Sequence, residues 1–219
     1  EDCIADELIA LLKKFVGELS LGLAYDPETG MGPILNEGHL KFVTDWIQKG
    51  VDEGAELIVD GRNPVVPGYE NGFYLAPSIF DHVTEEMSVG RKEIFGPVLC
   101  IKRVKDFEEG VAIMNASPFA NGSVIYTQNG YYAREFSKRT DAGMVGINVG
   151  IPVPLGIFGF TGHKDSFFGD LHVMGMDGVR FYTEQKNVTA TWFPEDTEVC
   201  GKVDTWDGTI SSMPVDSKT

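Results

Sequence analysis

The stretch SVIYTQNGYYAREFSKRTDAGMVGINV, residues 123–149, decides the fold class. Its two ends, 123–127 and 144–149, are short apolar runs that predict strands, and residues from about 130 to 140 predict a helix between them. Strands joined through a helix in this way lie parallel in a sheet. The residues therefore predict an α/β fold with a parallel sheet flanked by helices.

The N-terminal residues extend this pattern. Apolar side chains recur at helical spacing in two early segments, and Asn36 and Asp106 stand where they can cap helices. The expected elements are helices over residues 4–19, 37–53 and 106–115 and strands over residues 56–60, 73–80 and 98–104. Residues 1–178 are expected to form one main domain.

The C-terminal residues follow a different pattern. Seven of the 29 residues from 150 to 178 are glycine, four are phenylalanine, and no period is visible, which favours a binding loop. Residues 179–193 alternate and are rich in β-formers, so they predict one long strand, paired within its own chain or with a neighbouring subunit. Residues 194–219 are acidic and predict a surface tail.

Charge and composition exclude several classes of partner. The chain has 219 residues, 42% of them apolar, and a net charge of −15. No segment is net basic, so neither nucleic acid nor an anionic membrane surface is an expected partner. The longest stretch without polar side chains, Val149–Phe160, contains two prolines and cannot be a membrane helix.

The cysteines and histidines give no strong site. Three cysteines about a hundred residues apart favour a reducing compartment, expected to be the cytoplasm, or the mitochondrial matrix in a eukaryote. None of Cys3, Cys100 and Cys200 has the neighbours of an activated nucleophile. The histidines His39, His82, His163 and His172 are scattered and are interpreted as surface residues, so no metal site is expected.

The loop Glu93-Ile94-Phe95-Gly96-Pro97 is the most informative stretch for chemistry. A carboxylate with two oxygens can accept hydrogen bonds from both hydroxyls of a ribose, and a phenyl face can pack against a nicotinamide ring. In the alternative interpretation, Glu93 pairs with Arg91 or Lys92 at the surface and Phe95 is buried in the core. The residues alone leave both interpretations open.

The block EIFGPVL at Glu93–Leu99 resembles the signature of the NAD(P)-dependent aldehyde dehydrogenase superfamily. Two later stretches, GINVGIPVPL at residues 146–155 and FTG through SFFGDL within residues 160–171, resemble one branch of it. That branch is the CoA-acylating methylmalonate-semialdehyde dehydrogenases, which also act on malonate semialdehyde. The likeness runs from about Ile4 to Trp192.

The resemblance implies roles for particular residues. Glu93 would bind the hydroxyls of the nicotinamide-side ribose and Phe95 would pack against the nicotinamide, while Asn148, Ile151 and Phe158 would line the aldehyde tunnel. It further implies NAD as cofactor, coenzyme A as co-substrate, a small aldehyde as substrate, and a homodimer or homotetramer joined through strand 179–193.

The resemblance also implies that the chain is the C-terminal part of an aldehyde dehydrogenase-like catalytic domain. The nucleophilic cysteine would lie upstream of residue 1, so no catalytic residue is expected within the chain. In the whole enzyme the semialdehyde would be oxidised to an acyl-CoA with decarboxylation. Two alternatives remain open: a non-acylating aldehyde dehydrogenase, and a catalytically inactive half-fold that acts as a binding or oligomerisation protein.

Overall fold

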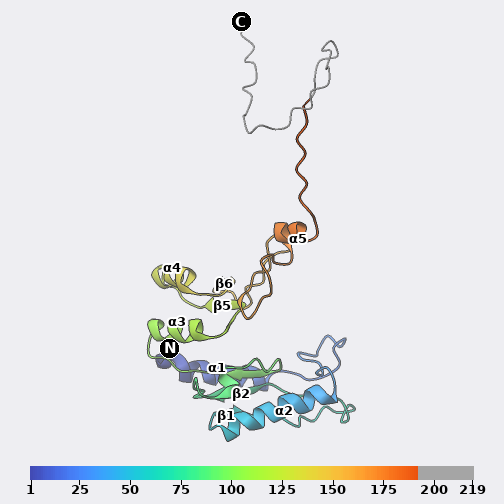
Figure 1. Cartoon of the computed structure of the whole chain (residues 1–219). Helices are drawn as coiled ribbons and strands as arrows, with labels where there is room; N and C mark the ends of the chain where they lie inside the picture. Colours follow the sequence, from blue (N-terminus) through green and yellow to red (C-terminus); the bar gives the residue numbers. More distant parts are fainter. Residues whose placement is uncertain (192–219) are drawn as a thin grey trace, which may run out of the picture. The chain divides into compact units, whose positions relative to one another are not determined.

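The computed structural model describes residues 1–191, which contain helices and short strands interspersed along the chain (Figure 1). The helices are α1 (Ala5–Gly17), α2 (Glu37–Asp52), α3 (Phe107–Ala116), α4 (Gly130–Arg139) and α5 (Gly175–Phe181), with 3-10 helices η1 (Asp2–Ile4) and η2 (Ser88–Gly90). The strands are β1 (Glu56–Val59), β2 (Ser78–Asp81), β3 (Val98–Cys100), β4 (Phe119–Ala120), β5 (Gly122–Ile125), β6 (Met144–Ile147) and β7 (His163–Lys164). Residues Glu1–Tyr182 form one compact unit, separate from the residues that follow.

Side-chain caps fix the starts of the two helices for which the sequence predicts them. Asn36 Oδ1 accepts a hydrogen bond from the amide of His39 at 2.8 Å, and Asp106 Oδ1 accepts one from the amide of Glu109 at 2.9 Å. Each cap satisfies an amide that has no partner inside the helix. The predicted helices at 4–19, 37–53 and 106–115 are confirmed, with small shifts at their ends.

The first sheet has three strands in the order β1-β2-β3. Strand β2 pairs antiparallel with β1 and parallel with β3, which places β2 in the centre. All four residues of β2 are buried. The predicted strand at 73–80 begins only at Ser78, because the preceding backbone is bonded to loops: the amide of Ala76 donates to Gly61 and the carbonyl of Phe73 accepts from Ile34.

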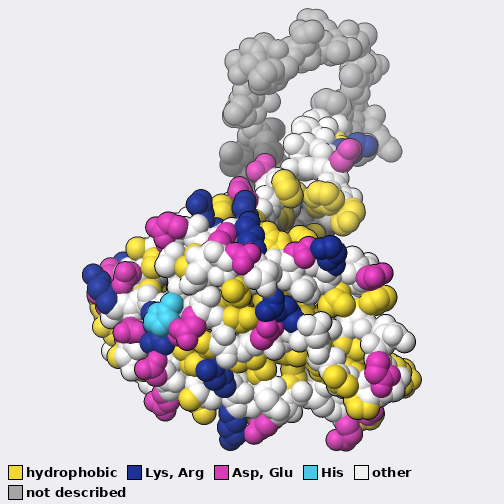
Figure 2. Space-filling model, turned by 90° about the horizontal axis from the view of Figure 1, so that it is seen from below, with side chains coloured by type: hydrophobic (Ala, Val, Ile, Leu, Met, Phe, Trp, Pro, Cys, Tyr) yellow, Lys and Arg dark blue, Asp and Glu magenta, His cyan; other side chains and the backbone are white. Residues whose placement is uncertain are grey.

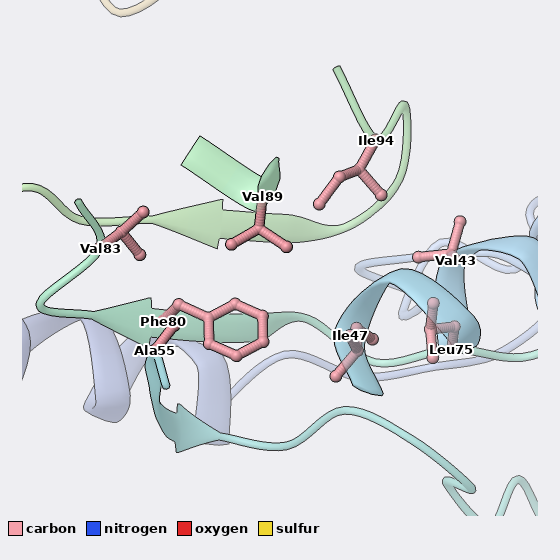
Figure 3. Packing of buried hydrophobic residues seen from close by; sticks show 8 residues of the cluster. All are labelled: Val43, Ile47, Ala55, Leu75, Phe80, Val83, Val89 and Ile94. Atoms are coloured by element: carbon pink, nitrogen blue, oxygen red, sulfur yellow. The ribbon is translucent and has the colours of Figure 1, made fainter. Parts of the chain in front are cut away.

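Helix α2 closes one face of this sheet. A buried hydrophobic cluster combines Phe80 of β2 with Val43 and Ile47 of α2, and Figure 3 shows side chains converging there from the strand, the helix and the loop that carries Ile94. The other members of the cluster are Ala55, Leu75, Val83 and Val89. Successive strand residues point to opposite faces, and Ile79 lines a cavity together with Leu12 and Val16 of α1. Helices α1 and α2 therefore lie against opposite faces.

Strands β5 and β6 form the predicted parallel pair, connected by α4. Their register joins Gly122 to Met144 and Ile125 to Ile147. Helix α4 packs on α3, where the rings of Phe107 and Tyr132 lie 5.0 Å apart. The strand-helix-strand expectation for residues 123–149 is thus confirmed.

The expected parallel sheet flanked by helices is confirmed only in part, because the parallel pairs β2–β3 and β5–β6 do not lie in one all-parallel sheet. Three separate small sheets are present in residues 1–191, and two of them contain an antiparallel pair: β1 with β2, and β4 with β7. Strands β3 and β5 are not hydrogen-bonded to each other. Alternation and length predict where a strand lies, but the choice of partner depends on residues far away in the chain.

The expected strand at 179–193 needs a correction at its start. Residues Val179–Phe181 belong to helix α5, where Arg180 pairs with Asp177 one turn earlier, at 3.4 Å. From Tyr182 to residue 191 the backbone forms no strand, because no other segment of the described chain pairs with it. Residues 192 and 193 and the acidic segment 194–219 lie outside the described residues, and pairing of residues 179–193 with another subunit stays a prediction.

The surface carries mixed charge. Figure 2 shows acidic and basic side chains interspersed on the face that it presents, with apolar side chains between them. One side of α1 is apolar and open, and its exposed apolar side chains are Leu8, Leu11 and Phe15, with Ile4 and Leu19 just before and after the helix. Within residues 1–191, no helix is long and apolar enough to cross a membrane.

Arg103 links the N-terminus to the first sheet. Its guanidinium donates to Asp81 at 2.7 Å, to Asp6 at 2.7 Å and to Asp2 at 3.1 Å. Asp81 is only 3% exposed, and the hydrogen bonds from Arg103 hold the pKa of its carboxyl below the ordinary value. Because this pKa is lower in the folded chain than in the unfolded chain, the pair contributes stability above about pH 4, which is lost as the pH falls through the folded pKa.

We expect Arg103→Met to lower the urea midpoint of the 219-residue chain at pH 7, because Asp81 would remain buried without its cation. The difference in urea midpoint between Arg103→Met and the unchanged chain should shrink below about pH 4, where Asp81 can take up a proton. Lys105→Met is the matched control, since Lys105 makes only a long contact of 3.9 Å with Asp106. Equal midpoints for the two variants across this pH range would contradict the account.

Candidate functional site

The loop from Glu93 to Pro97 lies directly on helix α2. Ile94 is buried in the cluster that α2 forms with β2. A Cβ atom built on Gly96 would lie 2.7 Å from Cγ2 and 2.9 Å from Cγ1 of Val43, closer than side chains tolerate. The absence of a side chain at position 96 therefore allows the loop backbone to touch the helix.

The other end of α2 holds the segment that leads into the loop. Glu53, the residue that follows α2, accepts hydrogen bonds from the amide and the hydroxyl of Ser88 at 2.7 and 2.5 Å. The Ser88 hydroxyl is the main cause that lowers the pKa of Glu53 below its ordinary value. Helix η2, at Ser88–Gly90, is thus tied to α2 as well. Both ends of the segment 88–96 are fixed by the same helix.

Phe95 has an unusual backbone and an open ring. Its φ is +52°, a left-handed conformation that costs a non-glycine residue about 1–3 kcal/mol. Its side chain is 79% exposed, while its carbonyl oxygen accepts a hydrogen bond from Nε2 of His39 at 2.9 Å. The alternative that buries Phe95 in the core is wrong. The loop presents an aromatic face to solvent from a fixed backbone.

Glu93 is exposed, and its carboxylate pairs with no cation among residues 1–191. In the described part of the chain it forms no ion pair with Arg91 or Lys92, so the surface salt bridge of the alternative interpretation is not formed. Its side chain borders two concavities, of about 330 and 500 Å³. Phe95 lines the smaller of these. Both carboxylate oxygens are available to accept hydrogen bonds beside an exposed ring.

Sequence reasoning did not find the residues opposite Glu93. The larger concavity is completed by Ser117, Phe119, Asn121, Asp165 and Ser166. Ser166 is held in place because its hydroxyl accepts from the amide of Ala120 at 3.0 Å. These residues come from two segments more than 40 positions apart, which gives no local pattern. The one sequence signal for these residues was the prediction of a binding loop at 150–178, which contains Asp165 and Ser166.

The three residues expected to line the aldehyde tunnel, Asn148, Ile151 and Phe158, do not line the cavities beside Glu93. Asn148 directly follows strand β6 and has a φ of +55°. Its side-chain Oδ1 accepts a hydrogen bond from the amide of Thr127 at 2.8 Å, and its Nδ2 donates one to the carbonyl of Thr127 at 2.9 Å. Ile151 and Phe158 are 76% and 59% exposed. None of the three lines the concavities at Glu93. Asn148 has a structural task that joins β5 to β6, and the tunnel assignment stays a prediction.

The structure does not change the interpretation that neither Cys3 nor Cys100 is an activated nucleophile. Cys100 is half-buried, its thiol lies 3.4 Å from the carbonyl of Val89, and burial raises its pKa above the ordinary value. A raised pKa opposes the thiolate that a nucleophile requires. Cys3 is exposed in η1, and Cys200 lies outside the described residues. Among residues 1–191, no group of three or more His, Cys, Asp or Glu is placed to hold a metal ion.

Comparison with known proteins gives the family. Residues 1–188 match the model of the aldehyde dehydrogenase family. The chain belongs to the aldehyde dehydrogenase family. Over 192 residues it is 48% identical to malonate-semialdehyde dehydrogenase 1 of Oceanobacillus iheyensis, an alignment that covers 88% of this chain and 39% of that relative. This aldehyde dehydrogenase chain thus spans about two fifths of the length of the curated relatives it matches.

Solved structures agree with this family. The methylmalonate-semialdehyde dehydrogenase of Oceanimonas doudoroffii matches with a TM-score of 0.85 and 40% identity, over 89% of this chain and 40% of that one. Aldehyde dehydrogenase C of Pseudomonas syringae, in a variant with a cysteine replaced by alanine and in complex with NAD⁺ and octanal, matches with a TM-score of 0.75 and 34% identity, over 83% and 36% of the two chains. The mixed α/β fold of this chain is that of part of an aldehyde dehydrogenase.

The contact between Gly96 and Val43 predicts a coupled effect on stability. Gly96→Ala should destabilise the chain by about 1–3 kcal/mol, because the added methyl group overlaps Val43. Val43→Ala creates the space, so the double variant should lose less than the sum of the two single losses. Gly156→Ala, with no atom within 4 Å of the added carbon, is the matched control. Strict additivity in urea unfolding would show that the loop does not rest on Val43.

Proposed function

We propose that this chain is the C-terminal portion of an NAD-dependent, CoA-acylating (methyl)malonate-semialdehyde dehydrogenase. The whole enzyme would oxidise the semialdehyde to an acyl-CoA with decarboxylation. The observation that carries the proposal is the exposed Glu93, which pairs with no side chain among residues 1–191, beside the exposed ring of Phe95 on a loop fixed by α2. The 48% identity with a malonate-semialdehyde dehydrogenase supports the choice of substrate class.

The residues of the loop fit a bound nicotinamide nucleotide. The free carboxylate of Glu93 can accept hydrogen bonds from both hydroxyls of the ribose, and the ring of Phe95 can pack against a flat heterocycle. NAD, when bound, supplies the acceptor for the hydride that leaves the substrate. The contribution of this chain is to bind and orient, because the left-handed backbone at Phe95 and the contact at Gly96 leave the loop little freedom.

The rest of the catalytic apparatus is proposed to come from other parts of the full-length protein. A cysteine outside this chain would act as the nucleophile, because Cys100 is half-buried with a raised pKa and the thiol of Cys3 contacts a carboxylate, that of Glu1, at 3.7 Å. The open apolar side of α1, which includes Phe15, supports contact with a further part of the protein, since apolar patches of this kind mark interfaces. A homodimer or homotetramer, with residues 179–193 at the subunit contact, completes the proposal.

The acylating branch is proposed over a hydrolytic enzyme because residues 146–155 and 160–171 resemble it. The two are separated by an assay of the full-length protein with malonate semialdehyde or methylmalonate semialdehyde and NAD. NADH formation that requires coenzyme A, with an acyl-CoA as product, supports the acylating reaction. NADH formation that is equally fast without coenzyme A, with a free acid as product, contradicts it.

We expect Glu93→Gln in the full-length enzyme to lower kcat/KM for NAD about ten- to a hundredfold, because a charge-assisted hydrogen bond to the ribose is lost. Thermal stability should change little, since Glu93 is exposed and bonds to no described side chain. Glu28→Gln, another exposed carboxylate, is the matched control. Unchanged NAD kinetics in Glu93→Gln would remove this residue from the cofactor site.

The 219-residue chain by itself should oxidise no aldehyde, because the proposed nucleophile lies outside it. Purified chain is mixed with NAD, coenzyme A and malonate semialdehyde, and the absorbance of NADH is followed. No rise above the blank is expected. Turnover would contradict the proposed division of the catalytic residues.

A further inference from the structure

His39 stands on the first turn of α2, where its backbone is already fixed. The amide of His39 donates to the capping side chain of Asn36, and the imidazole ring stacks on Phe42 three residues later, with ring centres 6.0 Å apart and planes inclined by 16°. The cap therefore fixes the backbone of His39, and Phe42 contacts its ring. Its Nε2 atom points to the loop that carries Glu93 and Phe95.

The contact between His39 and the loop has a defined donor. Nε2 lies 2.9 Å from the carbonyl oxygen of Phe95, and a carbonyl oxygen can only accept. Nε2 must therefore carry the hydrogen. The acceptor belongs to the residue with the left-handed backbone, φ +52°, so the hydrogen bond holds the peptide that follows the strained position.

We propose that His39 is a positioning residue for the nicotinamide end of the cofactor site, acting through the backbone of Phe95. The inference rests on the proposed function and assigns a role that the sequence did not indicate, since His39 was interpreted as a surface histidine. Val43 lies one turn further along α2 and supports the next residue of the loop, Gly96, by contact. Steric contact and the hydrogen bond together fix the direction in which the Phe95 ring faces.

The other described histidines do not share this arrangement. His163 bonds the carbonyl of Asp141, and His172 bonds the carbonyl of Gly162 and lies 3.4 Å from Asp177. His82 lies near the carboxylates of Glu56 and Asp81. Among the four histidines, all of which lie in residues 1–191, only His39 has a ring that forms a hydrogen bond with the loop of Glu93 and Phe95.

The kinetic test uses full-length enzyme with His39→Leu, His39→Gln and Phe42→Leu. Loss of one hydrogen bond should lower kcat about five- to tenfold in His39→Leu, with a smaller change in KM for NAD, because the ring is misdirected rather than removed. Glutamine carries an N–H at a similar reach, so His39→Gln should recover most of kcat. Phe42→Leu removes the stacking partner and its edge contact with Trp46, and it should lower kcat less than His39→Leu, because the hydrogen bond to Phe95 remains.

A second readout needs no catalysis. In the 219-residue chain labelled with ¹³C at phenylalanine carbonyls, the Phe95 resonance should move in His39→Leu and return in His39→Gln. A resonance that does not move overturns the hydrogen bond. A moved resonance with unchanged kcat, in an enzyme where Glu93→Gln still impairs NAD kinetics, overturns the positioning role alone. Unchanged NAD kinetics in Glu93→Gln would instead overturn the proposed function on which the role rests, and an equal loss in Phe42→Leu would assign the effect to stacking.

Discussion

A Cβ atom at Gly96 would lie 2.7 Å from Val43, so the backbone before β3 rests on helix α2 with no room for a side chain. The candidate site depends on this contact. Val43 and Ile47 bury the same helix against Phe80 and Ile94, so the hydrophobic cluster that stabilises the sheet also fixes the loop (Figure 3). Glu93 and Phe95 are displayed from the outer side of a loop whose inner side is part of the core.

The N-terminal and C-terminal ends of α2 add polar contacts to this packing. His39 bonds the carbonyl of Phe95, and Glu53 bonds Ser88 at the start of the segment that leads into the loop. The strained backbone of Phe95 is maintained because its surroundings fix it from several directions. A rigid aromatic face beside an exposed carboxylate suits a nicotinamide nucleotide, and it forms the proposed cofactor site of this aldehyde dehydrogenase chain.

Sequence patterns predicted the local parts of this structure well and the distant parts poorly. The helical period and the caps Asn36 and Asp106 located α2 and α3, and the EIFGP loop was identified as the candidate site. The hydrogen bond from His39 to the carbonyl of Phe95 joins residues 56 positions apart, so no periodic sequence pattern could predict it. The start of the strand expected over residues 179–193 is wrong, because Val179–Phe181 belongs to helix α5, which satisfies the backbone locally.

The most direct measurement of the central claim is a crystal structure of the full-length protein with NAD bound. The account predicts that both carboxylate oxygens of Glu93 lie about 2.6–3.2 Å from the hydroxyls of the nicotinamide-side ribose, with the ring of Phe95 against the nicotinamide and its backbone still left-handed. A structure in which Glu93 pairs with Arg91 or Lys92 while the ribose is bound by other residues would contradict it.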